Sequence, residues 1–303
     1  MRPLPRRGLA LAVGAVLLGG CGAGGLPPDG GRPSASAHIS HSTGTERRAA
    51  PKPVRPWNVH PPSVAALGDS ITRGFNACTP LSDCPEVSWA TGSKTKIDSV
   101  SERLAADTPA TRSWNLAQSG ARVADLPDQA RAAAAYKPAM VTVLIGANDA
   151  CARNTAAMTA VDDFRSDFAD AMSYLHRVLP ATQILVASIP DLQRLYSVGV
   201  QNPVERQLWR LGLCPTMLKD AGSHSASATE RRTEVRDRVV AYNSVLGQVC
   251  ARYQRCRYDG GAVFGYRFTA DELSKWDWFH PNEHGQAELA RILSAVVFGT
   301  DPP

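Results

Sequence analysis

The fold is decided by the stretch MVTVLIGAND at residues 140–149. Its first part, residues 140–145, contains only apolar and β-branched side chains, and Gly146 ends the run. A short, continuous apolar run bounded by glycine is typical of a strand that is buried on both faces of a parallel sheet. The polar residues Asn148 and Asp149 would then follow the carboxyl end of that strand.

Three other strand candidates alternate with helical segments along the chain. The expected strands cover residues 64–67, 114–117 and 183–188, and the expected helices cover 100–106, 126–135, 159–179, 229–252 and 282–297. Alternation of this kind implies a parallel sheet covered by helices on both faces. We therefore predict one α/β domain over residues 61–303, with its chemistry outside the carboxyl ends of the strands.

The N-terminus has the pattern of an export signal. Arg2, Arg6 and Arg7 precede an apolar run at residues 9–18, which is too short to span a bilayer but long enough for a signal-peptide core. The run ends in LGGC at residues 18–21, which resembles the lipobox of bacterial lipoproteins. That resemblance implies removal of residues 1–20 and a diacylglycerol thioether on Cys21. An ordinary secretory signal is the alternative, and twin-arginine export stays open.

Residues 21–60 are rich in Gly, Pro, Ser and Ala and show no hydrophobic period. Such a segment buries too little apolar surface to order itself, so it predicts a flexible tether. The protein would then be exported and either anchored by lipid to the outer face of a bacterial cell membrane or secreted. Without Arg2, Arg6 and Arg7, the net charge of +5 falls to about +2, which does not indicate a nucleic-acid binder.

Six cysteines follow Cys21 in the sequence: Cys78, Cys84, Cys151, Cys214, Cys250 and Cys256. Six thiols allow fifteen pairings. Their order along the chain favours the local pairs Cys78–Cys84 and Cys250–Cys256, which leaves Cys151–Cys214. Disulfides persist in the compartment of an exported protein. No C-x-x-C pair occurs, so we expect no metal site.

A candidate nucleophile follows the first expected strand, in the sequence Gly68-Asp69-Ser70. A serine hydroxyl becomes a useful nucleophile when a neighbouring base removes its proton. A tight turn after a strand would expose Ser70 at the functional edge of the sheet. Alternatively, Asp69 or Ser70 is only the N-cap of the next helix.

A candidate base lies near the C-terminus, in the sequence DWFHP at residues 277–281. The three-residue spacing allows Asp277 to accept a hydrogen bond from the ring of His280 and so fix its tautomer. His280 could then act as general base on Ser70. The alternative is an ordinary surface turn.

Two further candidates follow the second and third expected strands. Gly120 ends the sequence NLAQSG at residues 115–120, and Asn148 lies in the sequence GAND at residues 146–149. The backbone N–H groups of Ser70 and Gly120 and the side-chain amide of Asn148 could together form an oxyanion hole. Alternatively, Gly120 is a turn glycine and Asn148 a strand-end cap.

The set Ser70, Gly120, Asn148 and His280, in this order, resembles the four residues that name the SGNH (GDSL) hydrolases. The resemblance covers residues 63–298, with Ile71 where many members have leucine. It implies a three-layer, flavodoxin-like α/β/α fold with a central parallel sheet and ester hydrolysis through a serine acyl-enzyme, without a cofactor. By position, Ser70 would be the nucleophile, His280 the base and Asp277 its orienter, while Ser70, Gly120 and Asn148 would donate to the oxyanion.

Two stretches, residues 120–127 and 146–151, resemble more narrowly the phospholipase B-like branch and the secreted lipases and esterases of actinobacteria. This resemblance favours a small-molecule or lipid ester as substrate, hydrolysed by a monomer held near a membrane. One alternative is a carbohydrate acetylesterase acting on cell-wall or plant polysaccharide. Another is a surface binding lipoprotein with a vestigial site.

Overall fold

The computed structural model describes residues 56–107, 111–201 and 207–299. The expected signal peptide, Cys21 and most of the tether lie outside these residues. The described chain contains one parallel sheet in the strand order β2-β1-β3-β4-β5. The strands are β1 (Ser63–Gly68), β2 (Arg112–Asn115), β3 (Met140–Leu144), β4 (Gln183–Val186) and β5 (Cys256–Tyr258).

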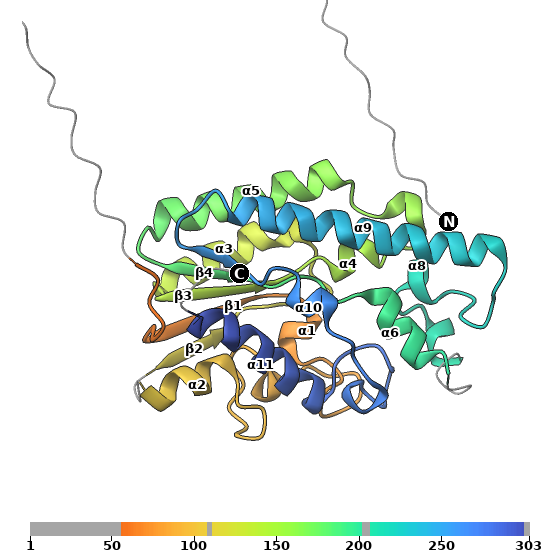
Figure 1. Ribbon diagram of the computed structural model, residues 1–303, viewed down its shortest axis with the longest axis horizontal. Coiled ribbons are helices and arrows are strands. Elements are labelled where there is room, and N and C mark those ends of the chain that lie inside the picture. The colour runs from red at the N-terminus through yellow and green to blue at the C-terminus, as the bar shows by residue number, and fades with distance from the viewer. Residues whose placement is uncertain (1–55, 108–110, 202–206, 300–303) are drawn as a thin grey trace, which may run out of the picture. The chain divides into compact units, whose positions relative to one another are not determined.

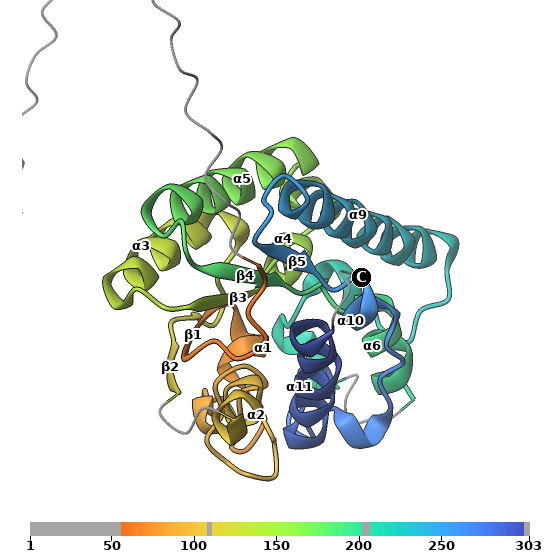
Figure 2. The same cartoon turned by 60° about the vertical axis from the view of Figure 1, so that its left-hand side comes forward.

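Helices cover both faces of this sheet (Figures 1 and 2). On one face lie α3 (Leu126–Tyr136), α5 (Val161–Val178) and α9 (Ala226–Cys250), and on the other lie α2 (Val100–Asp107) and α11 (Glu283–Phe298). The shorter helices are α1 (Ser70–Arg73), α4 (Ala147–Ala150), α6 (Leu192–Gly199), α8 (Pro215–Leu218) and α10 (Ala262–Gly265). The predicted α/β class and three-layer arrangement are therefore confirmed.

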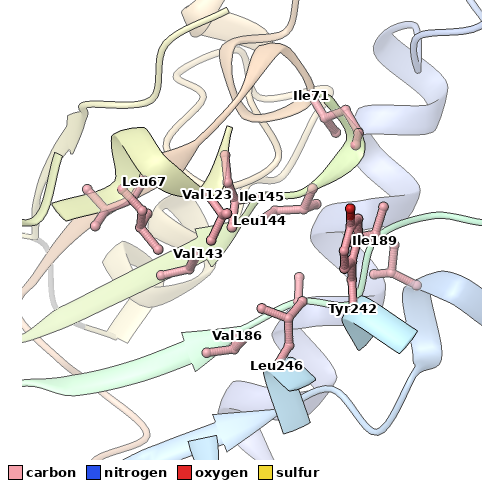
Figure 3. Packing of buried hydrophobic residues seen from close by; sticks show 14 of the residues in the cluster. Leu67, Ile71, Val123, Val143, Leu144, Ile145, Val186, Ile189, Tyr242 and Leu246 are labelled. Atoms are coloured by element: carbon pink, nitrogen blue, oxygen red, sulfur yellow. The ribbon is translucent and has the colours of Figure 1, made fainter. Parts of the chain in front are cut away.

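The core lies between the sheet and the helices, as Figure 3 shows for the region around β3 and α9. Leu67, Val143 and Val186 come from three neighbouring strands and are fully buried. On the helical side, the ring of Tyr242 on α9 stacks on Phe164 of α5, with ring centroids 4.1 Å apart. Burial of each such side chain stabilises the fold by about 1.5–3 kcal/mol, so this core holds the strand ends in fixed positions.

The strand pattern differs from the predicted one in two places. The second strand covers residues 112–115 instead of 114–117, because Arg112 to Asn115 pair with Ser63 to Ala66. The edge strand β5 was not predicted, since its sequence, CRY, is too short to show a period. Pairing with β4 and the disulfide from Cys256 to the end of α9 define this strand.

The last residues of the expected tether contact the domain. The indole Nε1 of Trp57 donates a hydrogen bond to the carbonyl of Val297 (2.9 Å). The Arg257 guanidinium lies 4.4 Å from the centre of the Trp57 ring. The backbone of Asn58 exchanges two hydrogen bonds with the side chain of Gln183. Trp57 and Asn58 thus pack against the domain, and the boundary at residue 61 stays a prediction. Within the described ranges, no helix is long and apolar enough to cross a membrane.

All three predicted disulfides are present: Cys78–Cys84, Cys151–Cys214 and Cys250–Cys256. By loop closure, the bridge of the longest loop, Cys151–Cys214, stabilises the fold by about 4 kcal/mol and each short one by about 2 kcal/mol. In the described part of the chain, one group of possible metal ligands occurs, Cys78, Cys84 and Glu86. Its two cysteines are bonded to each other, so they are not thiolate ligands.

Candidate active site

The turn from β1 to α1 places Ser70 at the carboxyl end of β1, the neighbour of the central strand β3. Gly68 has φ +144°, and a Cβ atom at this position would lie 2.2 Å from the carbonyl oxygen of Leu144 on β3. Only glycine therefore lets β1 end this close to β3. Asp69 then caps α1, since its Oδ1 accepts a hydrogen bond from the backbone N–H of Ile71 (2.9 Å). Ser70 is the first residue of the helix.

The base predicted from the C-terminal motif meets this serine. Ser70 Oγ lies 3.0 Å from His280 Nε2, and His280 Nδ1 lies 2.7 Å from Asp277 Oδ2. The loop that carries these two residues ends where the Asn282 side chain caps α11, accepting from the N–H groups of His284 and Gly285. Ser70 and His280 are 210 positions apart in sequence, and together with Asp277 they form one continuous line of hydrogen bonds.

Asp277 is surrounded by donors. Its Oδ1 accepts from the backbone N–H groups of Phe279 (3.0 Å) and His280 (2.9 Å), and its Oδ2 also accepts from the side-chain amide of Asn76 (2.6 Å). Burial alone would raise the pKa of Asp277, but the charge of His280 and these hydrogen bonds outweigh it and lower the pKa. Asp277 therefore stays ionised while buried.

The pKa of His280 is shifted in the opposite direction. Burial disfavours its charged form, yet the charge of Asp277 and the hydrogen bond to it raise the pKa of His280 above its ordinary value. The ring of Phe75 packs edge-on against the imidazole, with centroids 5.2 Å apart. His280 is therefore held in one orientation and readily accepts a proton.

Asn148 also reaches the cavity beside the serine, whereas Gly120 does not line it. The Asn148 side-chain amide donates to the carbonyl of Ala121 (2.9 Å), and Asn148 lines one cavity with Ser70 and His280. Gly120 lies in the exposed turn after β2, with φ +84°. The donor roles of Gly120 and Asn148 stay predictions.

The cavity beside Ser70 has a volume of about 220 Å³. It is lined by residues from α1, α4, α6, the segment before α8 and the His280 loop: Ser70, Ile71, Ala147, Asn148, Cys151, Leu192, Leu195, Gly212, Leu213, Cys214, Phe279 and His280. A larger hollow of about 910 Å³ along α9 shares none of these residues. Of these two, the cavity beside Ser70 is the one that contains the serine.

Two functional contacts were not foreseen from the sequence. Asn76, which donates to Asp277, lies in no recognisable motif, and Trp209 donates through Nε1 to the Asp277 backbone carbonyl (2.7 Å). Asp149, the residue after Asn148, accepts from Val123 N–H (2.9 Å) and from Thr159 Oγ1 (2.7 Å). It joins the turns after β2 and β3 from within the core.

A parallel α/β sheet with a hydrogen-bonded serine, histidine and aspartate at its carboxyl edge is the arrangement expected of a hydrolase. The family model for GDSL-like lipases and acylhydrolases matches residues 64–293. The chain belongs to this family and is an ester hydrolase.

One solved structure with a TM-score above 0.5 shows the same fold, and others are similar to the chain. An acetylxylan esterase from Geobacillus stearothermophilus, a catalytic mutant, is 18% identical with a TM-score of 0.51, covering 79% of this chain and 94% of its own. An α/β hydrolase from the metagenome of Lake Arreo, Spain, is also 18% identical with a TM-score of 0.48, covering 78% of this chain and 96% of its own. No protein of curated function matches the chain.

Proposed function

We propose that the protein hydrolyses carboxylic esters through an acyl-enzyme on Ser70, with His280 as general base and Asp277 as its orienter. The observation that carries this proposal is the line of hydrogen bonds from Ser70 Oγ to His280 Nε2 (3.0 Å) and from His280 Nδ1 to Asp277 Oδ2 (2.7 Å). In the neutral imidazole, the proton on Nδ1 is held by Asp277, so Nε2 presents its lone pair to the serine.

In the first half of the reaction, Ser70 Oγ bonds to the ester carbonyl carbon while its proton passes to His280 Nε2. The tetrahedral intermediate then collapses: the bond to the alcohol oxygen breaks, and His280 returns the proton to that oxygen. In the second half, His280 takes a proton from water as the hydroxide attacks the acyl carbon. The bond to Ser70 Oγ then breaks, His280 returns the proton to Oγ, and the acid leaves.

The oxyanion of the intermediate would receive N–H groups from Ser70, Gly120 and Asn148. The Asn148 amide nitrogen carries two hydrogens, and the bond to the Ala121 carbonyl uses one of them. The other is left for the oxyanion. Gly120 lies in an exposed turn outside the cavity lining, so its role as a donor rests on the family resemblance.

Lipid esters, either phospholipid acyl chains or triglyceride, are the substrates we propose. The narrower resemblance of residues 120–127 and 146–151 supports this choice, and so does the lipobox-like sequence that ends at Cys21. A lipid anchor on Cys21 would hold the enzyme beside bilayer lipids and raise its effective concentration there.

The proposal is tested by Ser70→Ala. The fold should be retained, because the hydroxyl contributes little to packing, while ester hydrolysis and labelling by a fluorophosphonate probe should be lost. Turnover within about tenfold of the wild type would overturn the assignment, because loss of a triad nucleophile costs orders of magnitude more. A parallel assay of phospholipid, short-chain nitrophenyl ester and acetylated xylan distinguishes a lipase from a carbohydrate acetylesterase. Wild-type protein that the fluorophosphonate probe does not label would support the alternative of a binding lipoprotein.

The anchor is tested by Cys21→Ser, which should move the protein from the membrane fraction to the medium or leave it as uncleaved precursor. Its activity on soluble short-chain esters should be unchanged, because a long segment separates residue 21 from the domain. A wild-type N-terminus downstream of Cys21, without a diacylglycerol mass, would contradict the anchor.

A further inference from the structure

The cavity beside Ser70 is apolar apart from the reacting groups. Its walls come from Leu192 and Leu195 on α6, from Leu213 in the segment before α8, and from Ile71 and Phe279 beside the catalytic residues. Among the described lining residues, no carboxylate, lysine or arginine is present, and the polar side chains are those of Ser70, Asn148 and His280. Such a surface favours a hydrocarbon chain over a sugar ring, whose hydroxyl groups would lose their hydrogen bonds to water.

The volume of the cavity limits the length of that chain. A methylene group takes up about the volume that a water molecule occupies in the liquid, ~30 Å³, so 220 Å³ accommodates roughly seven such groups. An acetyl group would leave most of the cavity unfilled. A palmitoyl chain would extend well beyond it.

One wall of the cavity is fixed at two points. Gly212, Leu213 and Cys214 form this wall. On one side of it, the buried indole of Trp209 donates to the backbone of Asp277 (2.7 Å). On the other side, Cys214 is bonded to Cys151, the residue that follows the helix carrying Asn148. Leu213 therefore lies between two fixed points: the hydrogen bond from Trp209 to Asp277, and the disulfide from Cys214 to Cys151 at the end of α4.

We propose that this cavity is an acyl-binding pocket for a chain of medium length, close to octanoyl, and that the Cys151–Cys214 disulfide sets its limit by fixing Leu213. The inference rests on the proposed reaction at Ser70 and narrows the proposed lipid esters to those with acyl chains of medium length. It also assigns this disulfide a role in specificity, whereas Cys250–Cys256 joins α9 to β5 and has neither cysteine in the cavity.

The test measures kcat/KM on acetyl, butyryl, octanoyl, lauroyl and palmitoyl esters of p-nitrophenol. For the wild type we expect a rise of roughly tenfold or more from acetyl to octanoyl, since buried methylenes strengthen binding, followed by a fall for lauroyl and palmitoyl. Leu213→Ala should move the maximum to longer chains, and Leu213→Trp should move it to shorter ones. Ile292→Ala truncates another half-buried aliphatic residue, on α11, and should leave the profile unchanged.

The disulfide is tested with the double substitution Cys151→Ser/Cys214→Ser, compared with Cys250→Ser/Cys256→Ser. Each is assayed at a temperature where its circular dichroism shows a folded protein. The first variant should lose most of the preference for octanoyl over palmitoyl, and the second should keep it. Equal profiles in the two variants would overturn the role of the Cys151–Cys214 disulfide.

The outcomes separate this inference from the proposed function. A profile that is flat or highest for acetyl, in a wild type whose activity depends on Ser70, would overturn the acyl pocket and leave the serine mechanism standing. Full activity of Ser70→Ala on every ester would overturn the mechanism itself.

Discussion

Two buried aspartates lie close to His280, and their pKa values are shifted in opposite directions. Asp277, in the loop before α11, has a lowered pKa, whereas burial raises the pKa of Asp69, in the turn after β1, to about 7. Asp277 accepts hydrogen bonds from two backbone N–H groups, Asn76 and His280. Asp69 accepts one from Ile71 N–H, and its Oδ2 has no partner among the described residues.

The difference shows that a close opposite charge and hydrogen-bond donors, and not burial alone, decide whether a carboxylate at this sheet edge stays charged. Asp277 can stabilise an imidazolium on His280 because its own charge is already compensated. Asp69 is a helix cap whose ionised form is costly in the folded state. The two residues should therefore respond very differently to the same substitution, Asp→Asn.

Asp277→Asn should lower kcat by about 10⁴-fold, because an amide favours the wrong tautomer of His280 and cannot stabilise its protonated form. The circular dichroism spectrum should be unchanged. Steady-state kinetics on a nitrophenyl ester measures the effect. A loss below about tenfold would mean that Asp277 does not orient the base.

The pH dependence should show the same coupling. The pKa of His280 is raised, so in the wild type kcat/KM should fall about tenfold per pH unit below a point that lies above 6.5, as the base becomes protonated. In Asp277→Asn this acidic limb should move to lower pH, since burial then acts without the opposing charge. An unmoved limb would show that another group controls the profile.

Asn76→Gly should lower kcat by about tenfold, the value of one hydrogen bond to a charged group. Glycine suits the backbone at this position, where φ is +57°. Because Asn76 Oδ1 also accepts from Leu81 N–H (2.5 Å), Asn76→Asp is the matched control. Asn76→Asp keeps the acceptor for Leu81 N–H but places a second carboxylate against Asp277, so its kcat should also be low. Wild-type kcat in Asn76→Asp would show that Asn76 serves only to hold the turn.

Asp69→Asn should have the smallest catalytic effect, less than about threefold, because the side chain lacks a direct hydrogen bond to Ser70 or His280 among the described residues. Its effect should be on stability. In the folded state Asp69 retains its proton up to about pH 7, whereas in the unfolded chain it loses it near 3.8. Stability therefore falls as pH rises through this window. The variant should melt above the wild type at pH values above about 7, and melting curves that coincide would refute the raised pKa.

The sequence predicted which side chains meet at the candidate site, because each lies at the end of a strand or in a short motif. Ser70, Asn148 and the pair Asp277 and His280 are all recognisable from residues next to them. The pairing of six cysteines was also correct, since two local pairs leave only one long bridge.

The contacts that adjust this site could not be predicted in the same way. Asn76 reaches Asp277 across 201 positions, and Trp209 does so across 68. These approaches depend on how the loops fold over the sheet edge, and no local period encodes them. The short strand β5 was missed for a related reason, because its definition comes from its neighbour β4 and from the disulfide to α9.

The separation of Ser70 and His280 also has a consequence for synthesis of the protein. The proposed nucleophile, Ser70, leaves the ribosome 210 residues before the proposed base, His280, and α11, which lies on the same face of the sheet as α2, follows that base. A nascent or prematurely terminated chain therefore carries a serine with no group to activate it. Under the proposed roles, hydrolysis has to wait until the segment that carries Asp277 and His280 has been made and has reached Ser70.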